Sequence, residues 1–114
     1  MVDSTGSFGE KEAEKYLTKI GYSILYRNFR SRFGEIDIIA KNGGQVVFVE
    51  VKTRTQEMFG TPLEAITPQK IRKIIKTAQY YILRNNISDY RFDAIEVQLG
   101  AREILINHIK NITF

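Results

Sequence analysis

The pattern of hydrophobic and polar residues along this chain changes period several times, and each change predicts a new element. From Phe8 to Ile20, apolar residues recur every three or four positions, which predicts an amphipathic helix. Gly21 follows the last apolar position, as is common at a helix C-terminus. The residues expected to face the core are Ala13, Tyr16, Leu17 and Ile20.

A period of two then predicts three strands, at Tyr22–Phe29, Gly34–Ala40 and Gln45–Thr53. The last two are separated by Lys41-Asn42-Gly43-Gly44. Asn and Gly tolerate positive φ, so this segment favours a tight turn and the two strands should form a hairpin.

The second half of the chain predicts a loop, a helix and two more strands. The loop covers 54–66, with Gly60 and Pro62, and Thr67-Pro68 has the residue types of a helix start. The helix should run to Asn85. Its core-facing residues should be Ile71, Ile74, Ile75, Ala78 and Ile82, and the strands should cover 91–99 and 103–109.

These elements predict an α/β fold with a mixed sheet, in the order α-β-β-β-α-β-β. A strand, a helix and a further strand make a βαβ unit, for which a parallel pairing and a right-handed crossover are expected. At 114 residues the chain is the size of one domain, so we expect a single domain over 1–114 with residues 1–7 loose.

Three charged residues interrupt the two most strand-like segments. Asp37 lies in one strand, and Glu50 and Lys52 lie in the next. If Asn42-Gly43 forms the turn, Asp37 lies diagonal to Glu50, and if Gly43-Gly44 forms it, they lie directly opposite. In both registers the three side chains point to one side of the hairpin.

Opposed carboxylates destabilise a sheet unless something compensates their repulsion. A divalent cation would do so, because Mg²⁺ or Mn²⁺ takes oxygen ligands and completes its shell with water and phosphate. Asp37 and Glu50 are therefore the predicted metal ligands, with Lys52 placed to stabilise developing negative charge. The alternative is that these residues form an ordinary ion-pair network on a half-exposed strand.

Glu10 has two readings that the sequence leaves open. Ser7-Phe8-Gly9-Glu10 matches a capping box, with Ser7 as N-cap. Glu10 also lies at the edge of the core-facing stripe, from which it could reach a metal or a water molecule. Asp93 is interpreted as the partner of Arg91 in a local ion pair, and His108 as a strand residue without a catalytic role.

Composition narrows the functional classes. The net charge of +4, from 17 basic and 13 acidic residues, favours a polyanionic partner. The alternative is a solvated basic surface without a partner. No cysteine is present and only one histidine, which excludes thiolate sites and sites with two imidazoles from one chain. No secretory signal or membrane-length apolar run is visible, so we expect a cytoplasmic protein without membrane contact.

Three segments carry a family resemblance: "GEKEAEKYLTKIGYSILYRNFRSRFGEIDIIA", "VVFVEVKTR" and "RFDAIEV". They closely resemble the bacterial YraN family of predicted endonucleases, and the core resembles the restriction-endonuclease-like PD-(D/E)xK superfamily, which includes archaeal Holliday junction resolvases. The resemblance implies Asp37 as the first acid, Glu50 and Lys52 as the E-x-K pair, and Glu10 as the helical acid. This sequence departs from the superfamily's pattern at the "PD" dipeptide, whose place is taken by Ile36-Asp37.

The resemblance also implies accessory roles for Gln69 and Lys70 at the start of the second helix. Arg30, Arg32 and Arg54, near strand ends, are further candidates for binding nucleic acid. The predicted function is that of a Mg²⁺- or Mn²⁺-dependent endonuclease acting on DNA, with branched or flapped structures as candidate substrates. The alternatives are a non-catalytic nucleic-acid-binding module and an assembly protein. Cleavage of a junction needs two active sites, which a homodimer would supply.

Overall fold

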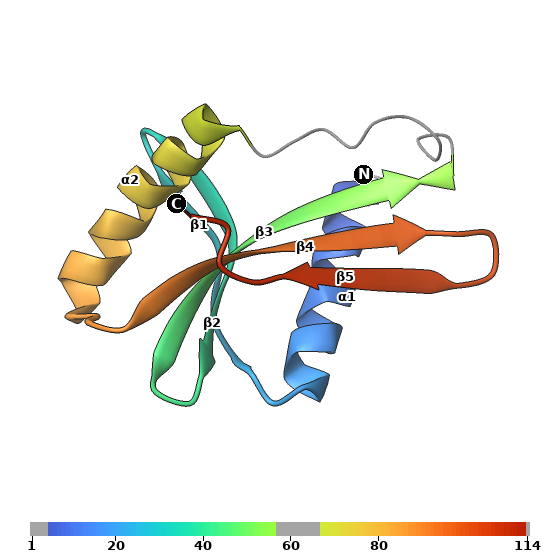
Figure 1. Ribbon diagram of the computed structural model, residues 1–114, viewed down its shortest axis with the longest axis horizontal. Helices are drawn as coiled ribbons and strands as arrows, with labels where there is room; N and C mark the ends of the chain where they lie inside the picture. Colours follow the sequence, from blue (N-terminus) through green and yellow to red (C-terminus); the bar gives the residue numbers. More distant parts are fainter. Residues whose placement is uncertain (1–4, 57–66, 114) are drawn as a thin grey trace.

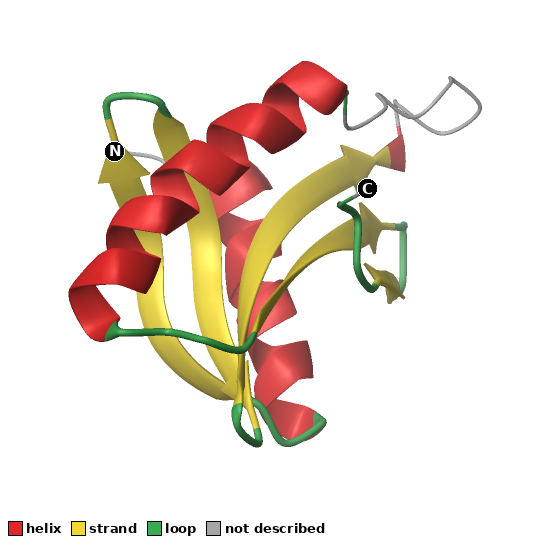
Figure 2. Ribbon diagram, turned by 60° about the vertical axis from the view of Figure 1, so that its left-hand side comes forward, coloured by secondary structure: helices red, strands yellow, loops and turns green. Residues whose placement is uncertain are grey.

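In the computed structural model, which describes residues 5–56 and 67–113, two helices pack on opposite faces of one five-stranded sheet (Figures 1 and 2). In chain order the elements are α1 (Thr5–Lys19), β1 (Ser23–Ser31), β2 (Gly34–Asn42), β3 (Gln45–Thr55), α2 (Pro68–Asn85), β4 (Tyr90–Leu99) and β5 (Ile104–Ile109). The predicted α/β class and element order are confirmed.

The strands lie in the order β1-β2-β3-β4-β5. All neighbouring pairs are antiparallel except β3 and β4, which are parallel because α2 connects them. Thr67 caps α2 as predicted, since its hydroxyl accepts a hydrogen bond from the Lys70 N–H at 3.1 Å. No helix in the described segments is long and apolar enough to cross a membrane.

The β2–β3 turn resolves the two registers that the sequence left open. Asn42 pairs with Gln45, so Gly43-Gly44 is the two-residue loop, and Gly43 has φ +60. The same register pairs Ile39 with Phe48 and Ile38 with Val49. It brings Asp37 opposite Glu50, as the second of the two alternatives predicted.

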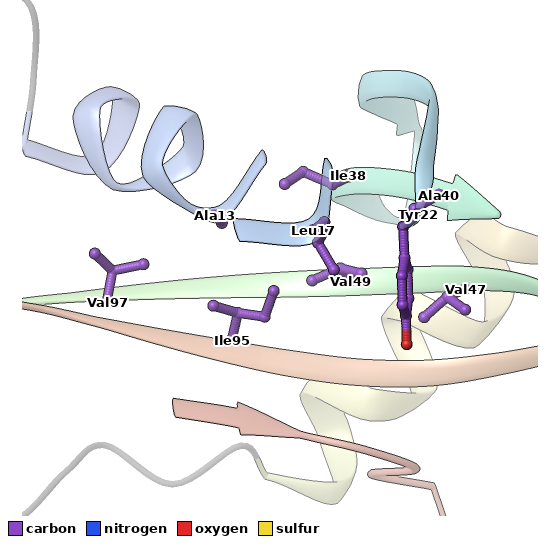
Figure 3. Close-up of a cluster of buried hydrophobic side chains, with 9 residues drawn as sticks. All are labelled: Ala13, Leu17, Tyr22, Ile38, Ala40, Val47, Val49, Ile95 and Val97. Atoms are coloured by element: carbon purple, nitrogen blue, oxygen red, sulfur yellow. The ribbon is translucent and has the colours of Figure 1, made fainter. Parts of the chain in front are cut away.

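The core consists of two hydrophobic clusters, one on each face of the sheet. Ala13 and Leu17 of α1 cover the first, as Figure 3 shows, and Ile74 and Ala78 of α2 cover the second. Alternation along β3 supplies both faces, because successive side chains point to opposite sides. In the first cluster, α1 packs on Tyr22, Ile38, Ala40, Val47, Val49, Ile95 and Val97.

Three boundary predictions are wrong. The helix α1 begins at Thr5, so residues 5–7 are helical instead of loose, and Ser7 lies inside the helix, where it cannot serve as the N-cap. Tertiary packing of α1 outweighs the weak helix propensity of this segment. Ile20 lies beyond the helix end and is 45% exposed, because the chain turns at Gly21 with φ +97 and the Tyr22 N–H bonds the Leu17 carbonyl.

The third wrong boundary concerns the predicted loop at 54–66. The strand β3 continues to Thr55 because it pairs with β4 as far as Leu99, so Arg54 is a strand residue. Positions 57–66 of the predicted loop lie outside the described residues.

Gly9 sets how closely α1 approaches the sheet. A Cβ atom added at Gly9 would lie 1.9 Å from Thr53 Oγ1 and 3.0 Å from Thr53 Cβ. Rotation of Thr53 could move the hydroxyl away but not Cβ. Only glycine therefore lets the first turns of α1 lie directly on β3, and this contact places Glu10 beside the sheet.

Gly9→Ala is expected to lower the free energy of unfolding by roughly 1–3 kcal/mol, although alanine is the better helix former. Urea denaturation would measure the change. Gly44→Ala is the control, with no atom within 4 Å of the added Cβ and an expected effect within about 0.5 kcal/mol. In a double-mutant cycle with Thr53→Gly, which removes the Thr53 Cβ, Gly9→Ala should cost less than it does in the wild type. An unchanged cost would contradict the close contact between α1 and β3.

Candidate active site

The candidate site lies where β2 and β3 stop pairing. The last pair of their ladder is Ile38 with Val49. One residue further, the Asp37 carboxylate accepts a hydrogen bond from the Val51 N–H at 2.7 Å, in place of a backbone carbonyl. If the register is continued by one residue, Asp37 lies opposite Glu50, and the two carboxyl groups are hydrogen-bonded to each other. The two acidic side chains are therefore in contact at the place where the strands diverge.

This contact changes the acidity of Asp37. Burial, the negative charge of Glu50 and the hydrogen bond between the two carboxyl groups raise the pKa of Asp37 to about 7, against a weaker opposing effect of the Val51 N–H. Two carboxylates so close cannot both ionise easily. Near neutral pH, the pair therefore retains a proton for part of the time unless a cation replaces it.

Glu10 approaches the same point from the opposite face of the sheet. Its carboxylate accepts a hydrogen bond from Asn28 Nδ2 at 3.1 Å. Asn28 is opposite Asp37 in the β1–β2 register and has φ +52, a left-handed conformation that asparagine tolerates. Burial raises the pKa of Glu10 despite the Asn28 bond, and the charges of Asp37 and Glu35 raise it further. Glu10 is therefore near Asp37. Of the two alternatives that the sequence left open, the capping box is wrong because Ser7 lies inside α1.

The parallel pairing of β3 and β4 adds an acid that sequence reasoning missed. Lys52 pairs with Glu96, so both side chains lie on the sheet face that also carries Glu50. Glu96 is 6% exposed, accepts a hydrogen bond from Gln98 Nε2 at 3.2 Å and lies 3.9 Å from Arg54 Nη1. The sequence signal for Glu96 is the alternation within "RFDAIEV", but its position beside Lys52 depends on the strand register.

The donor set at this point suits a hard divalent cation. Within the described part of the chain, no three acidic or histidine side chains gather into one metal-binding cluster. Mg²⁺ does not require one, because it usually binds one or two carboxylates and retains several waters. Asp37 and Glu50 supply two carboxyl groups in contact, and a cation would offset the repulsion that raises the pKa of Asp37, so these residues fit Mg²⁺ or Mn²⁺.

The predicted nucleic-acid-binding residues lie in different surroundings. Gln69 is exposed and Lys70 half-buried in the first turn of α2, and Arg32 is exposed in the β1–β2 turn. The guanidinium of Arg30 is 77% exposed and bonds Glu35 at 2.6 Å. Arg54 differs from these four: its side chain is only 12% exposed and lies beside Glu96. Its position is more enclosed than expected for a surface phosphate contact.

A second polar cluster lies in the core beneath α1. Asp93 is fully buried and binds Arg91 through both carboxylate oxygens, at 2.8 and 2.9 Å. It also accepts bonds from His108 Nε2 at 2.8 Å and the Asn111 N–H at 2.9 Å. The predicted ion pair of Asp93 with Arg91 is confirmed, and it is part of a larger network.

That network reaches α1 through a histidine. An ionised carboxylate only accepts hydrogen bonds, so His108 Nε2 donates to Asp93 and, in the neutral ring, Nδ1 accepts from the Tyr16 hydroxyl at 2.9 Å. Arg91 also donates to the Tyr22 hydroxyl at 3.0 Å. The network therefore joins α1, β4 and β5 and helps to hold the helix that carries Glu10.

Comparisons with known proteins show which family and which fold this chain resembles. The model of uncharacterised protein family UPF0102 matches residues 9–97. A UPF0102 protein of Caldanaerobacter subterraneus subsp. tengcongensis is 50% identical, over 95% of this chain and 93% of the relative. One from Clostridium botulinum is 55% identical, over 84% of this chain and 80% of the relative.

Among solved structures, the fold is similar to that of a Holliday junction resolvase from the archaeon Archaeoglobus fulgidus. The TM-score is 0.55 and the identity 19%, and the match covers 89% of this chain and 72% of the resolvase. The expected resemblance to a nuclease-like fold is confirmed at the level of the fold.

Proposed function

This chain belongs to the uncharacterised protein family UPF0102, and we propose that it is a Mg²⁺- or Mn²⁺-dependent endonuclease that hydrolyses phosphodiester bonds in DNA. The observation that carries the proposal is the hydrogen-bonded pair of Asp37 and Glu50 at the point where β2 and β3 diverge. The basic excess of the chain and the name of the archaeal resolvase with a similar fold favour DNA as the substrate.

Each residue of the site has a proposed role. Asp37 and Glu50 hold the cation, which when bound supplies Lewis-acid chemistry that activates water and screens phosphate charge. The ammonium group of Lys52 stabilises the charge that develops on the phosphate. Glu10, with its raised pKa, orients the attacking water or accepts its proton. Gln69 and Lys70 contact phosphates outside the cleavage point.

A cleavage panel tests the proposal. Labelled duplex, single-stranded, flapped and four-way-junction DNA, together with RNA, would be incubated with Mg²⁺, Mn²⁺ or EDTA. Metal-dependent cleavage of at least one DNA substrate is expected, with no product in EDTA. Salt-dependent DNA binding without cleavage under any metal would replace the proposal with a non-catalytic nucleic-acid-binding module, and absence of both would favour an assembly protein.

Metal binding should depend on pH through Asp37. Because its pKa is about 7 without metal, binding below pH 7 must release a proton. Affinity should fall by up to about tenfold per pH unit below pH 7 and level off above pH 8. Calorimetric titration of Mn²⁺ in two buffers with different ionisation enthalpies would count the protons.

Nearly one proton per Mn²⁺ is expected at pH 6 and almost none at pH 8.5. Asp37→Asn should abolish both the proton release and most of the affinity, whereas Glu103→Gln, at an exposed site, should change neither. Binding to the wild-type protein without proton release at pH 6 would show that the metal does not occupy the Asp37 carboxylate.

A further inference from the structure

A hollow of about 590 Å³ lies between β1 and the C-terminal half of α2. It borders the acidic site, because Asn28, which bonds Glu10, is among its lining residues. Two tyrosines in its wall are unusually exposed, Tyr26 at 51% and Tyr80 at 42%. Three arginines line it as well, namely Arg30, Arg32 and Arg84, and no acidic residue is among the lining residues. The hollow thus combines accessible aromatic surface with concentrated positive charge.

A second hollow of about 430 Å³ adjoins the first, and Arg32 lines both. Its remaining lining residues are Phe33, Gln69, Arg72, Lys73 and Lys76. Figure 1 shows why the two are neighbours, because the end of the β1–β2 hairpin lies beside α2. Near the middle of that helix, Ser31 and Thr77 share a hydrogen bond of 2.8 Å. The two hollows share Arg32, and cationic side chains that include residues of α2 line both of them.

Stacked rings and cations form the wall between the two hollows. Phe33 stacks on Tyr80, with ring centroids 6.3 Å apart and 26° between the ring planes. Arg32 and Lys76 lie 5.0 and 5.1 Å from the Phe33 centroid. Tyr26 in turn packs edge-on against Phe29 at 5.5 Å. These contacts hold the rings from behind while part of each tyrosine stays open to a ligand.

Proteins that bind single-stranded nucleic acid commonly use exposed aromatic rings beside cationic side chains. Unpaired bases stack on aromatic side chains, and cations follow the phosphates between them. A paired duplex keeps its bases stacked inside the helix and would meet only the cations. An acidic protein partner would match the charge but has no need of two open tyrosine rings.

We propose that the hollow bounded by Tyr26, Tyr80 and Arg84 binds an unpaired, single-stranded segment of nucleic acid, with its bases stacked on the two tyrosines. The basic hollow along the N-terminal half of α2 then accommodates the adjoining backbone. Asn28 connects this surface to the acidic site, because it lines the hollow, donates a hydrogen bond to Glu10 and lies opposite Asp37 in the β1–β2 register. The surface thereby selects substrates that have an unpaired strand next to the scissile bond. This substrate selection rests on the proposed endonuclease activity.

Binding can be tested without metal or cleavage. Fluorescence anisotropy in EDTA would measure the affinity of the full chain for labelled 12-nucleotide oligo(dT) and for a blunt duplex, at several salt concentrations. Tyr26→Leu and Tyr80→Leu keep apolar packing but remove the aromatic ring, and each should raise the Kd for oligo(dT) roughly tenfold. Arg84→Gln should lower the slope of log K against log salt by about 0.7.

Matched controls separate this surface from general effects. Tyr90→Leu removes a tyrosine of equal exposure, 43%, outside the hollow, and Lys110→Gln removes an exposed charge elsewhere. Tyr90→Leu should change oligo(dT) affinity less than twofold, Lys110→Gln should leave the salt slope unchanged, and the tyrosine variants should bind the duplex as the wild type does. Thermal melts would confirm that each variant is folded.

Equal oligo(dT) affinity in the wild type and both tyrosine variants would overturn the proposal, as would failure of the wild type to bind oligo(dT) at low salt. Neither result depends on cleavage, so the endonuclease proposal would stand or fall separately on the cleavage panel.

Discussion

Asp37→Asn and Glu50→Gln are each expected to reduce metal-dependent DNA cleavage by at least roughly a thousandfold. Both substitutions keep the size of the side chain and remove one of the two charges proposed to hold the cation. Single-turnover cleavage of the best substrate from the panel would measure the loss. Glu103→Gln, at an exposed acid after β4, is the matched control and should cleave as the wild type does.

The same variants should be more stable than the wild type at neutral pH and without metal. The folded-state pKa of Asp37 is raised from 3.8 to about 7, so ionising it destabilises the folded protein as pH rises between these values. Asp37→Asn removes that penalty, which gives a gain of roughly 1–3 kcal/mol at pH 8 that disappears near pH 4. An amide oxygen can still accept the Val51 N–H. Urea melts at both pH values would test this, and a strongly destabilised Asp37→Asn would favour a structural ion-pair network over a metal site.

Asp93→Asn should cause the largest loss of stability, roughly 3–5 kcal/mol, because it leaves the largely buried charge of Arg91 without its partner. Chemical denaturation at pH 7 would measure it. The control is Glu12→Gln, which breaks an ion pair to Lys15, a side chain that is 75% exposed, and should cost less than about 1 kcal/mol. Similar losses in the two variants would contradict the view that the Asp93 network organises the core.

Asp93 should also determine how the protein responds to acid. Burial alone would raise the pKa of Asp93, but hydrogen bonds from His108, Arg91 and the Asn111 N–H outweigh it and lower the pKa to about 2. A lowered pKa stabilises the folded state above pH 4, and this contribution of about 2 kcal/mol is lost as pH falls from 4 to 2. Asp93→Asn should therefore lack this part of the acid transition, which circular dichroism during an acid titration would follow.

Because α1 is tied to the network through Tyr16, the effect of Asp93→Asn should extend to the candidate site. Partial release of α1 would displace Glu10 from Asn28 and Asp37. Hydrogen exchange of the α1 amides is the direct measure. Exchange in α1 should accelerate more than exchange in α2, because Tyr16 of α1 is hydrogen-bonded to the network.

Local sequence was enough to predict the elements and the acidic pair. Side-chain alternation has a period of two, so Asp37 and Glu50 share a face of the hairpin in either register that the Gly-rich turn allows. Thr67-Pro68 marks the start of α2 because capping is a local interaction. The apolar stripe of α2 likewise follows from helix periodicity, and Ile71, Ile74 and Ala78 are buried as predicted.

Contacts between distant segments decided what the sequence left open. Glu10 was equally consistent with a cap or a ligand until the packing of Gly9 on Thr53 placed it beside Asn28. The position of Glu96 beside Lys52 required the register of a parallel pair, which no turn specifies. Tyr16 and His108 are 92 residues apart, and no periodic pattern relates them. Turn chemistry and periodicity act over a few residues, whereas the docking of a helix and the register of a crossover strand depend on the whole core at once.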